Sequence, residues 1–177
     1  GSCATSVAER ARRAAPLGPL VLIVALQAAL DGRLLHAATN FDEGVYLAAA
    51  DALHHGQRLG SDVFAAQFPG FYDLLRVLSL PDPSSVAGIR AAFVGVFCLG
   101  AIGAWLVGRR FGGGLGAALT AGLWVVAPPL DLFGSQVIAD TPALALTVLA
   151  IGLATLGGTA AAVGVGVVFA VALSIKL

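Results

Sequence analysis

The sequence predicts an all-α membrane protein with about five transmembrane helices and two amphipathic helices in the first outer loop. Of its 177 residues, 58% are hydrophobic and only 11% are charged, whereas soluble domains carry about 25% charged residues. The apolar residues also gather into runs close to the roughly 20 residues that cross a bilayer. The net charge is zero, and the absence of a basic field excludes nucleic acid as an expected partner.

Glycines and prolines separate the expected spans. The Gly112–Gly114 run divides the second span from the third, and Gly157-Gly158 make the turn between the fourth and the fifth. The first span has the basic start of a signal peptide, but its apolar run is long and more spans follow, so we expect it to be retained. The five predicted spans are Ala14–Leu30, Ala91–Val107, Leu115–Leu130, Pro142–Leu156 and Thr159–Ile175.

Arginines beside short loops predict the orientation, because they favour the cytoplasmic side. They are Arg10, Arg12, Arg13, Arg109 and Arg110. We therefore expect one transmembrane module over residues 1–177, with a cytoplasmic tail at 1–13 and an extracytoplasmic loop at 31–90, in the plasma or inner membrane. Of the ten carboxylates, only Glu9 then lies inside. The polar chemistry is expected on the extracytoplasmic face.

The first outer loop shows helical periodicity in two places. Apolar residues recur at helical spacing from Glu43 to His55, where Gly56 is placed to end the helix. A shorter pattern covers 68–80, and Pro81 stops it. Both helices are amphipathic, so we expect them on the outer membrane surface. The loop aromatics then anchor at the interface, or stack on a sugar; they are Tyr46, Phe68, Phe71 and Tyr72.

The pair Asp42-Glu43 opens the first of these helices. One interpretation is structural: Asn40 and Glu43 have the spacing of a capping box, and Asp42 complements the helix dipole. The other is functional: Asp42 points at the helix bundle and accepts a proton as a general base. Sequence alone leaves both open.

Asp140 precedes the fourth span and has the same two interpretations. It is either an N-cap before Pro142 or a second outer carboxylate near Asp42. Two such carboxylates would hold a divalent metal ion or sugar hydroxyls, and Asp131 is a weaker third candidate. His54-His55 are a further metal candidate, but adjacent helical residues diverge by about 100°. A solvated helix end explains them better.

Two cations are expected at the outer interface. Arg90 starts the second span and Lys176 ends the fifth. Each either extends toward lipid headgroups or binds the phosphate of an anionic lipid.

Three segments together resemble a known family. They are "NFDEGVYLAAADALHHGQRLGSDVFAAQFPGFYDLL", "VAGIRAAFVGVFCLGAIGAWLVGRRFGG" and "QVIADTPALALTVLAIGLATL". In order, spacing and topology they are similar to the N-terminal part of GT-C fold glycosyltransferases of the protein-mannosyltransferase-like group, whose bacterial relatives modify lipid A or cell-wall polymers. The resemblance covers about Pro16 to Leu177. One departure is the Phe68-Pro69-Gly70-Phe71 stretch, where many relatives have a Pro-Pro pair.

The resemblance implies an inverting enzyme that uses a polyprenyl-phosphate sugar as donor and a lipid, glycan or protein as acceptor. The family's catalytic acidic residue corresponds to Asp42, with Glu43 beside it. The acidic residue before the fourth span corresponds to Asp140. The basic residues that open the second span and end the fifth correspond to Arg90 and Lys176.

The sequence thus predicts a membrane glycosyltransferase module of the cell envelope. Asp42 is the expected general base, and Glu43, Asp140, Arg90 and Lys176 are the expected substrate ligands. A divalent metal on Asp42 and Asp140 stays open as the cofactor. The alternative is a non-catalytic scaffold or a transporter fragment. The sequence contains no methionine and begins with Gly1-Ser2, so we expect a piece of a longer protein that is inactive alone.

Overall fold

The computed structural model describes residues 17–127 and 134–176. Over these residues the chain forms six helices and no strand, so the all-α prediction is confirmed. The predicted N-terminal tail and Asp131 lie outside the described residues, as do residues 14–16 of the first predicted span and 128–130 of the third. The helices are α2 (Leu17–Gly32), α3 (Phe41–His54), α4 (Pro69–Leu78), α5 (Val86–Val126), α7 (Asp140–Ala154) and α8 (Gly158–Ile175).

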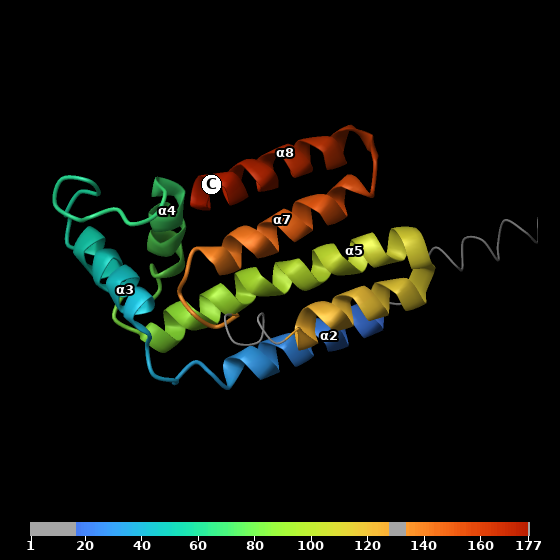
Figure 1. The fold of residues 1–177 in the computed structure, drawn as a ribbon, viewed down its shortest axis with the longest axis horizontal. Coiled ribbons are helices and arrows are strands. Elements are labelled where there is room, and N and C mark those ends of the chain that lie inside the picture. Colours follow the sequence, from blue (N-terminus) through green and yellow to red (C-terminus); the bar gives the residue numbers. More distant parts are fainter. Residues whose placement is uncertain (1–16, 128–133, 177) are drawn as a thin grey trace, which may run out of the picture.

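Helix α5 contains a reversal and holds the second predicted span and residues 115–126 of the third. The backbone at Gly113 has φ 62° and ψ −148°, a conformation that side chains rarely permit and that glycine adopts freely. The chain turns back there, and Figure 1 shows the two arms of α5 running side by side. The prediction that glycines at 112–114 separate two helical segments is therefore confirmed.

The two arms of α5 pack with their backbones close together. A methyl group on Gly108 would overlap the Gly116 backbone, and the Trp124 ring fills the space that a side chain on Gly100 would need. The Thr120 hydroxyl donates to the Ala104 carbonyl at 2.8 Å. Small residues permit this approach, as they also do where helices pack in membranes.

Two of the helices are long and apolar enough to cross a membrane, namely α5 and α8. The apolar helices α2 and α7 have 16 and 15 residues. At a rise of 1.5 Å per residue they extend roughly 23 Å, against about 30 Å for a typical hydrocarbon core. Membrane-type helices are thus present, and the number of five spans stays a prediction.

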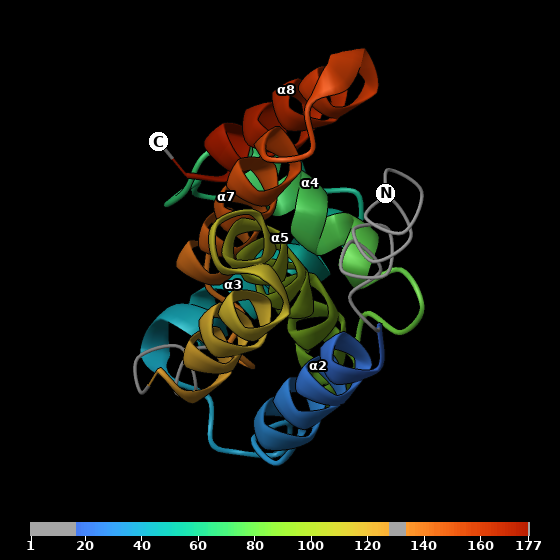
Figure 2. The same ribbon diagram turned by 90° about the vertical axis from the view of Figure 1, so that its right-hand side faces the viewer.

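The helix ends gather at two opposite ends of the bundle (Figure 1), and Figure 2 views the bundle end-on. One end, called here the α3–α4 end, holds α3, α4, the C-termini of α2 and α8, and the N-termini of α5 and α7. The other, called here the arginine end, holds the reversal at Gly113 with the nearby Arg109-Arg110, and the turn at Gly157-Gly158. The predicted outer loops therefore share one end, whichever leaflet that end faces.

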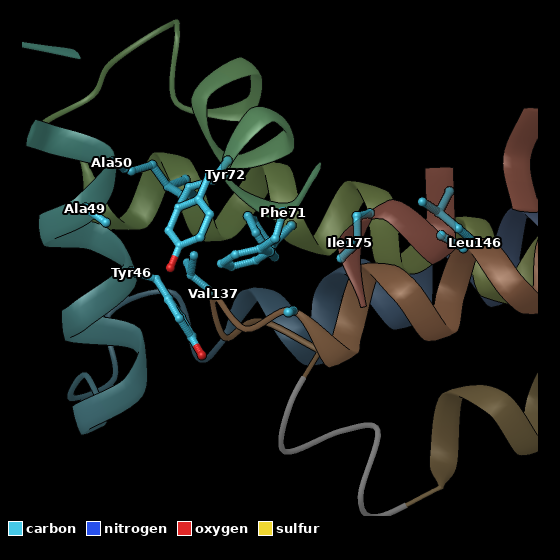
Figure 3. Packing of buried hydrophobic residues seen from close by; sticks show 13 residues of the cluster. Tyr46, Ala49, Ala50, Phe71, Tyr72, Val137, Leu146 and Ile175 are labelled. Atoms are coloured by element: carbon cyan, nitrogen blue, oxygen red, sulfur yellow. The ribbon is translucent and has the colours of Figure 1, made fainter. Parts of the chain in front are cut away.

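The largest hydrophobic cluster lies at the α3–α4 end (Figure 3). The Phe71 ring of α4 lies edge-on to Tyr46 of α3 at 4.9 Å between centroids and to Phe93 of α5 at 6.3 Å. Phe71, Tyr72 and Leu75 are at most 1% exposed. Burial of aromatic side chains of this size attaches α4 firmly to the bundle.

This packing corrects one expectation. Both loop helices form near the predicted bounds, and Gly56 follows α3 with φ 85°. Three of the four loop aromatics, however, are buried inside the protein and so do not anchor at an interface: Tyr46, Phe71 and Tyr72. Phe68 is exposed, and its role as an anchor stays a prediction. An amphipathic pattern predicts a buried face, but it does not distinguish burial in lipid from burial against other helices.

Candidate functional site

The main polar feature of the α3–α4 end is a buried ion pair between Glu43 and Arg90. The guanidinium meets the carboxylate through two parallel contacts, Nε to Oε1 at 2.8 Å and Nη2 to Oε2 at 2.6 Å. The backbone N–H of Val137 donates to the same Oε1 at 3.1 Å. Glu43 is 0% exposed and Arg90 is 2% exposed. The pair therefore joins the N-termini of α3 and α5 to the segment before α7.

The remaining donors of Arg90 bind the connector between α2 and α3. Its Nη1 donates to the carbonyls of Leu34, Leu35 and Ala37 at 3.2, 2.9 and 2.7 Å, and Nη2 lies 3.5 Å from the Ala38 carbonyl. A guanidinium has five N–H donors, so protein acceptors account for all of them. This geometry assigns Arg90 and Glu43 a positioning role, and in this arrangement neither side chain is available for a phosphate or a sugar.

Asp42 lies beside this pair but faces the other way. It is exposed on the first turn of α3, whereas Glu43 is buried, because adjacent helical side chains diverge by about 100°. No hydrogen bond or ion pair of Asp42 is found within residues 17–127 and 134–176. The Asp42 carboxylate is thus accessible, and the ion pair of Glu43 fixes the helix turn that carries it.

The predicted capping by Asn40 is confirmed, but the reciprocal part of the box is not formed. The Asn40 Oδ1 accepts the backbone N–H of Glu43 at 2.7 Å. The Glu43 carboxylate turns to Arg90 and Val137, away from the Asn40 backbone. The Asn40 Nδ2 donates to Gln136 Oε1 at 2.8 Å, which adds a second connection to the segment before α7.

Asp140 and Lys176 form an exposed ion pair. Asp140 is the first residue of α7, whose N-cap is Ala139, so the prediction of Asp140 as the N-cap is wrong. Its carboxylate instead meets the ammonium of Lys176 at the C-cap of α8. The side chains are 64% and 43% exposed, respectively. Both groups therefore stay open to a ligand at the α3–α4 end.

Lys176 also lines an open cavity of about 320 Å³. Its other walls come from residues 65–69, in the loop that leads into α4. That loop is held from behind, because the Gln67 Nε2 donates to the Tyr46 hydroxyl and the Ala66 N–H donates to the Tyr72 hydroxyl, each at 2.9 Å. The cavity thus combines a cation with a supported wall.

The predicted divalent metal on Asp42 and Asp140 stays a prediction. Within the described part of the chain no three residues of the types His, Cys, Asp and Glu gather closely enough to hold an ion. His54 Nε2 lies 2.7 Å from the Ser79 hydroxyl, whereas the exposed His55 contacts Asp51 on its own helix. The two histidines therefore have separate local partners.

Two buried polar residues escaped the sequence analysis. Asp31 was expected in the outer loop, but α2 continues to Gly32 and buries Asp31 and Gln27 to 2% exposure. A Cβ on Gly134 would lie 2.7 Å from an Asp31 carboxylate oxygen. The Asp31 carboxylate therefore fits because residue 134 is a glycine. Gln27 and Asp31 are four residues apart, which places both on one helix face. This spacing is the feature of the sequence that could have indicated a shared polar face.

Comparison with known proteins identified no relative. No family model, no curated protein and no solved structure matches the chain.

Proposed function

We propose that the chain is the membrane module of a GT-C type glycosyltransferase. It transfers a sugar from a polyprenyl-phosphate donor to a hydroxyl of a lipid, glycan or protein acceptor on the extracytoplasmic face. The observation that carries the proposal is the exposed Asp42 carboxylate beside the buried Glu43–Arg90 pair. A reactive group on a rigid support is what catalysis by positioning requires.

In the proposed reaction, Asp42 accepts the proton of the acceptor hydroxyl as that oxygen attacks the anomeric carbon. The bond from the anomeric carbon to the phosphate oxygen breaks, and polyprenyl phosphate leaves with the bonding electrons. A general base needs its proton donor within about 2.6–3.2 Å, directly or through one water. The accessible position of Asp42 leaves room for such an acceptor.

The leaving phosphate needs a cation, and Lys176 is the better placed of the two predicted ones. Arg90 is buried and its donors are taken up by protein groups. Lys176 is 43% exposed and lines the cavity beside α4. We propose that the ammonium of Lys176 stabilises the negative charge of the departing phosphate. Asp140 orients this ammonium. This revises the roles expected for Arg90 and Glu43, which position Asp42 from beneath.

The test is sugar transfer from a labelled polyprenyl-phosphate donor in membranes that contain the full-length protein. Asp42→Asn removes the base and keeps the shape, so transfer is expected to fall by a factor of about 10²–10⁴. Asp51→Asn is the matched control, because Asp51 is an exposed carboxylate on the same helix; it is expected to leave transfer unchanged. Full transfer by Asp42→Asn at normal expression would contradict the proposal.

A non-catalytic scaffold is the second candidate, and the saturation of Arg90 favours it. The Arg90 guanidinium donates to one carboxylate and to backbone carbonyls. A side chain bonded in this way connects segments of the protein. This reading predicts no transfer by the wild-type protein from any donor tested. It also predicts that Asp42→Asn leaves folding and assembly intact.

A further inference from the structure

Charge is separated between the two ends of the bundle. Every carboxylate within the described residues lies in segment 31–82 or at Asp140, and Figure 1 places these segments at the α3–α4 end. The arginine end carries Arg109 and Arg110 and no described carboxylate. Neither arginine makes a hydrogen bond or ion pair within residues 17–127 and 134–176. Two neighbouring guanidinium groups therefore stay uncompensated there.

These arginines line a cavity of about 600 Å³. The first arm of α5 contributes Leu106, Arg109 and Arg110, and the end of α7 contributes Thr155 and Leu156. Arg109 is half-buried and Arg110 is exposed, and both line the cavity. The volume is sufficient for a phosphate group with its glycerol.

The start of α8 adds to the positive potential. This helix follows the cavity residues Thr155 and Leu156 after a two-glycine turn, and its N-cap Gly157 has no side chain to bind the first amides. The first amides of a helix lack internal partners and carry the positive end of the helix dipole. The arginines and these amides favour the same kind of ligand, an anion.

The surroundings of the cavity are apolar. Phe111 is 84% exposed, Leu115 is 74% exposed and Leu156 is 59% exposed. Large apolar side chains next to unpaired cations are unfavourable in water alone, but they match the boundary between acyl chains and headgroups. Both α5 and α8, which meet this end, have the length and composition to cross a bilayer.

We propose that this cavity binds the phosphate of an anionic phospholipid such as phosphatidylglycerol. Arg109 and Arg110 contact the phosphate oxygens, for which the planar guanidinium has matching donor geometry. The acyl chains lie along the exposed apolar side chains beside them. The site is independent of the glycosyltransferase proposal, since it uses the opposite end of the bundle and none of the residues assigned there.

The test uses the purified chain in a neutral detergent, with bound lipid counted by native mass spectrometry. Phosphatidylglycerol is expected to bind at least tenfold more tightly than zwitterionic phosphatidylcholine. The double variant R109Q/R110Q is expected to lose that preference, with roughly a fivefold loss for each arginine removed. The control R58Q/R76Q removes the same charge from exposed residues of the α3–α4 end and is expected to keep the preference.

Two results would overturn the proposal. One is equal phosphatidylglycerol binding by R109Q/R110Q and the wild type, with an unchanged thermal unfolding temperature showing that both are folded. The other concerns the source of the phosphate. If inorganic phosphate displaces phosphatidylglycerol at equal concentration, a free anion is the ligand; failure of phosphate to compete supports the lipid.

Discussion

The two ends of the bundle are built from different interactions. At the α3–α4 end, charged groups that are far apart in sequence are buried against each other, with Glu43 and Arg90 47 residues apart. Toward the arginine end, backbones approach each other at glycines, and the two cations there are only half-buried or exposed. Polar contacts around an aromatic cluster stabilise the first end. Close backbone packing at glycines stabilises the second.

This difference shows that charge density alone does not locate a functional group. Glu43 and Arg90 are buried charges that hold helices in place. The charges that a ligand can reach are exposed or partly exposed: Asp42 and Lys176 at one end, and Arg109 and Arg110 at the other. A charged group that is buried and fully hydrogen-bonded has a structural role. A charged group that is accessible beside a rigid support is available to bind a ligand.

The largest effect is expected from breaking the buried pair. Arg90→Leu leaves the Glu43 carboxylate buried without its cation, and removing one partner of such a pair costs about 3–5 kcal/mol. The measurement is unfolding in detergent. Arg76→Leu, an exposed arginine of α4, serves as the control and is expected to change stability little. Equal stability of the two variants would mean that the α3–α4 end is held by its aromatic cluster alone.

A smaller loss is expected where α5 meets α7. A Cβ on Gly103 would overlap the backbone of Val148, whereas nothing lies within 4 Å of one on Gly95 of the same helix. Gly103→Ala is therefore expected to cost about 1–3 kcal/mol through overpacking. Gly95→Ala is expected to be neutral or to stabilise by up to about 1 kcal/mol. Similar unfolding curves for both variants would argue against close backbone packing.

The smallest effect on stability is expected at the exposed pair. Asp140→Asn or Lys176→Gln breaks an ion pair whose side chains are 64% and 43% exposed, and such pairs contribute about 0–1 kcal/mol. High salt should remove even this difference, since it screens exposed charges. A loss comparable to that of Arg90→Leu would show that both ion pairs are structural. Unchanged stability with lost sugar transfer in Lys176→Gln would support a ligand role.

The sequence singled out charged residues that lie at one end of the bundle, but it did not predict how they pair. Asp42, Glu43, Arg90, Asp140 and Lys176 were singled out from position and charge, and all five lie in segments of the α3–α4 end. The capping by Asn40 was readable because it spans three residues. The pairing of Glu43 with Arg90 in place of the capping box could not be predicted from the sequence. A buried carboxylate is stabilised more by a bidentate contact with a cation than by one backbone amide.

The sequence by itself determined the helical class, the apolar segments, the reversal near Gly113 and the end of α3 just before Gly56. Each depends on composition or on neighbours within a few residues, so local rules suffice. Only the tertiary structure decided which charges are buried, because Glu43–Arg90 and Asp140–Lys176 join residues 47 and 36 positions apart. It also decided that the loop aromatics pack inside. Burial depends on what lies opposite a side chain, and that partner is supplied by a distant part of the chain.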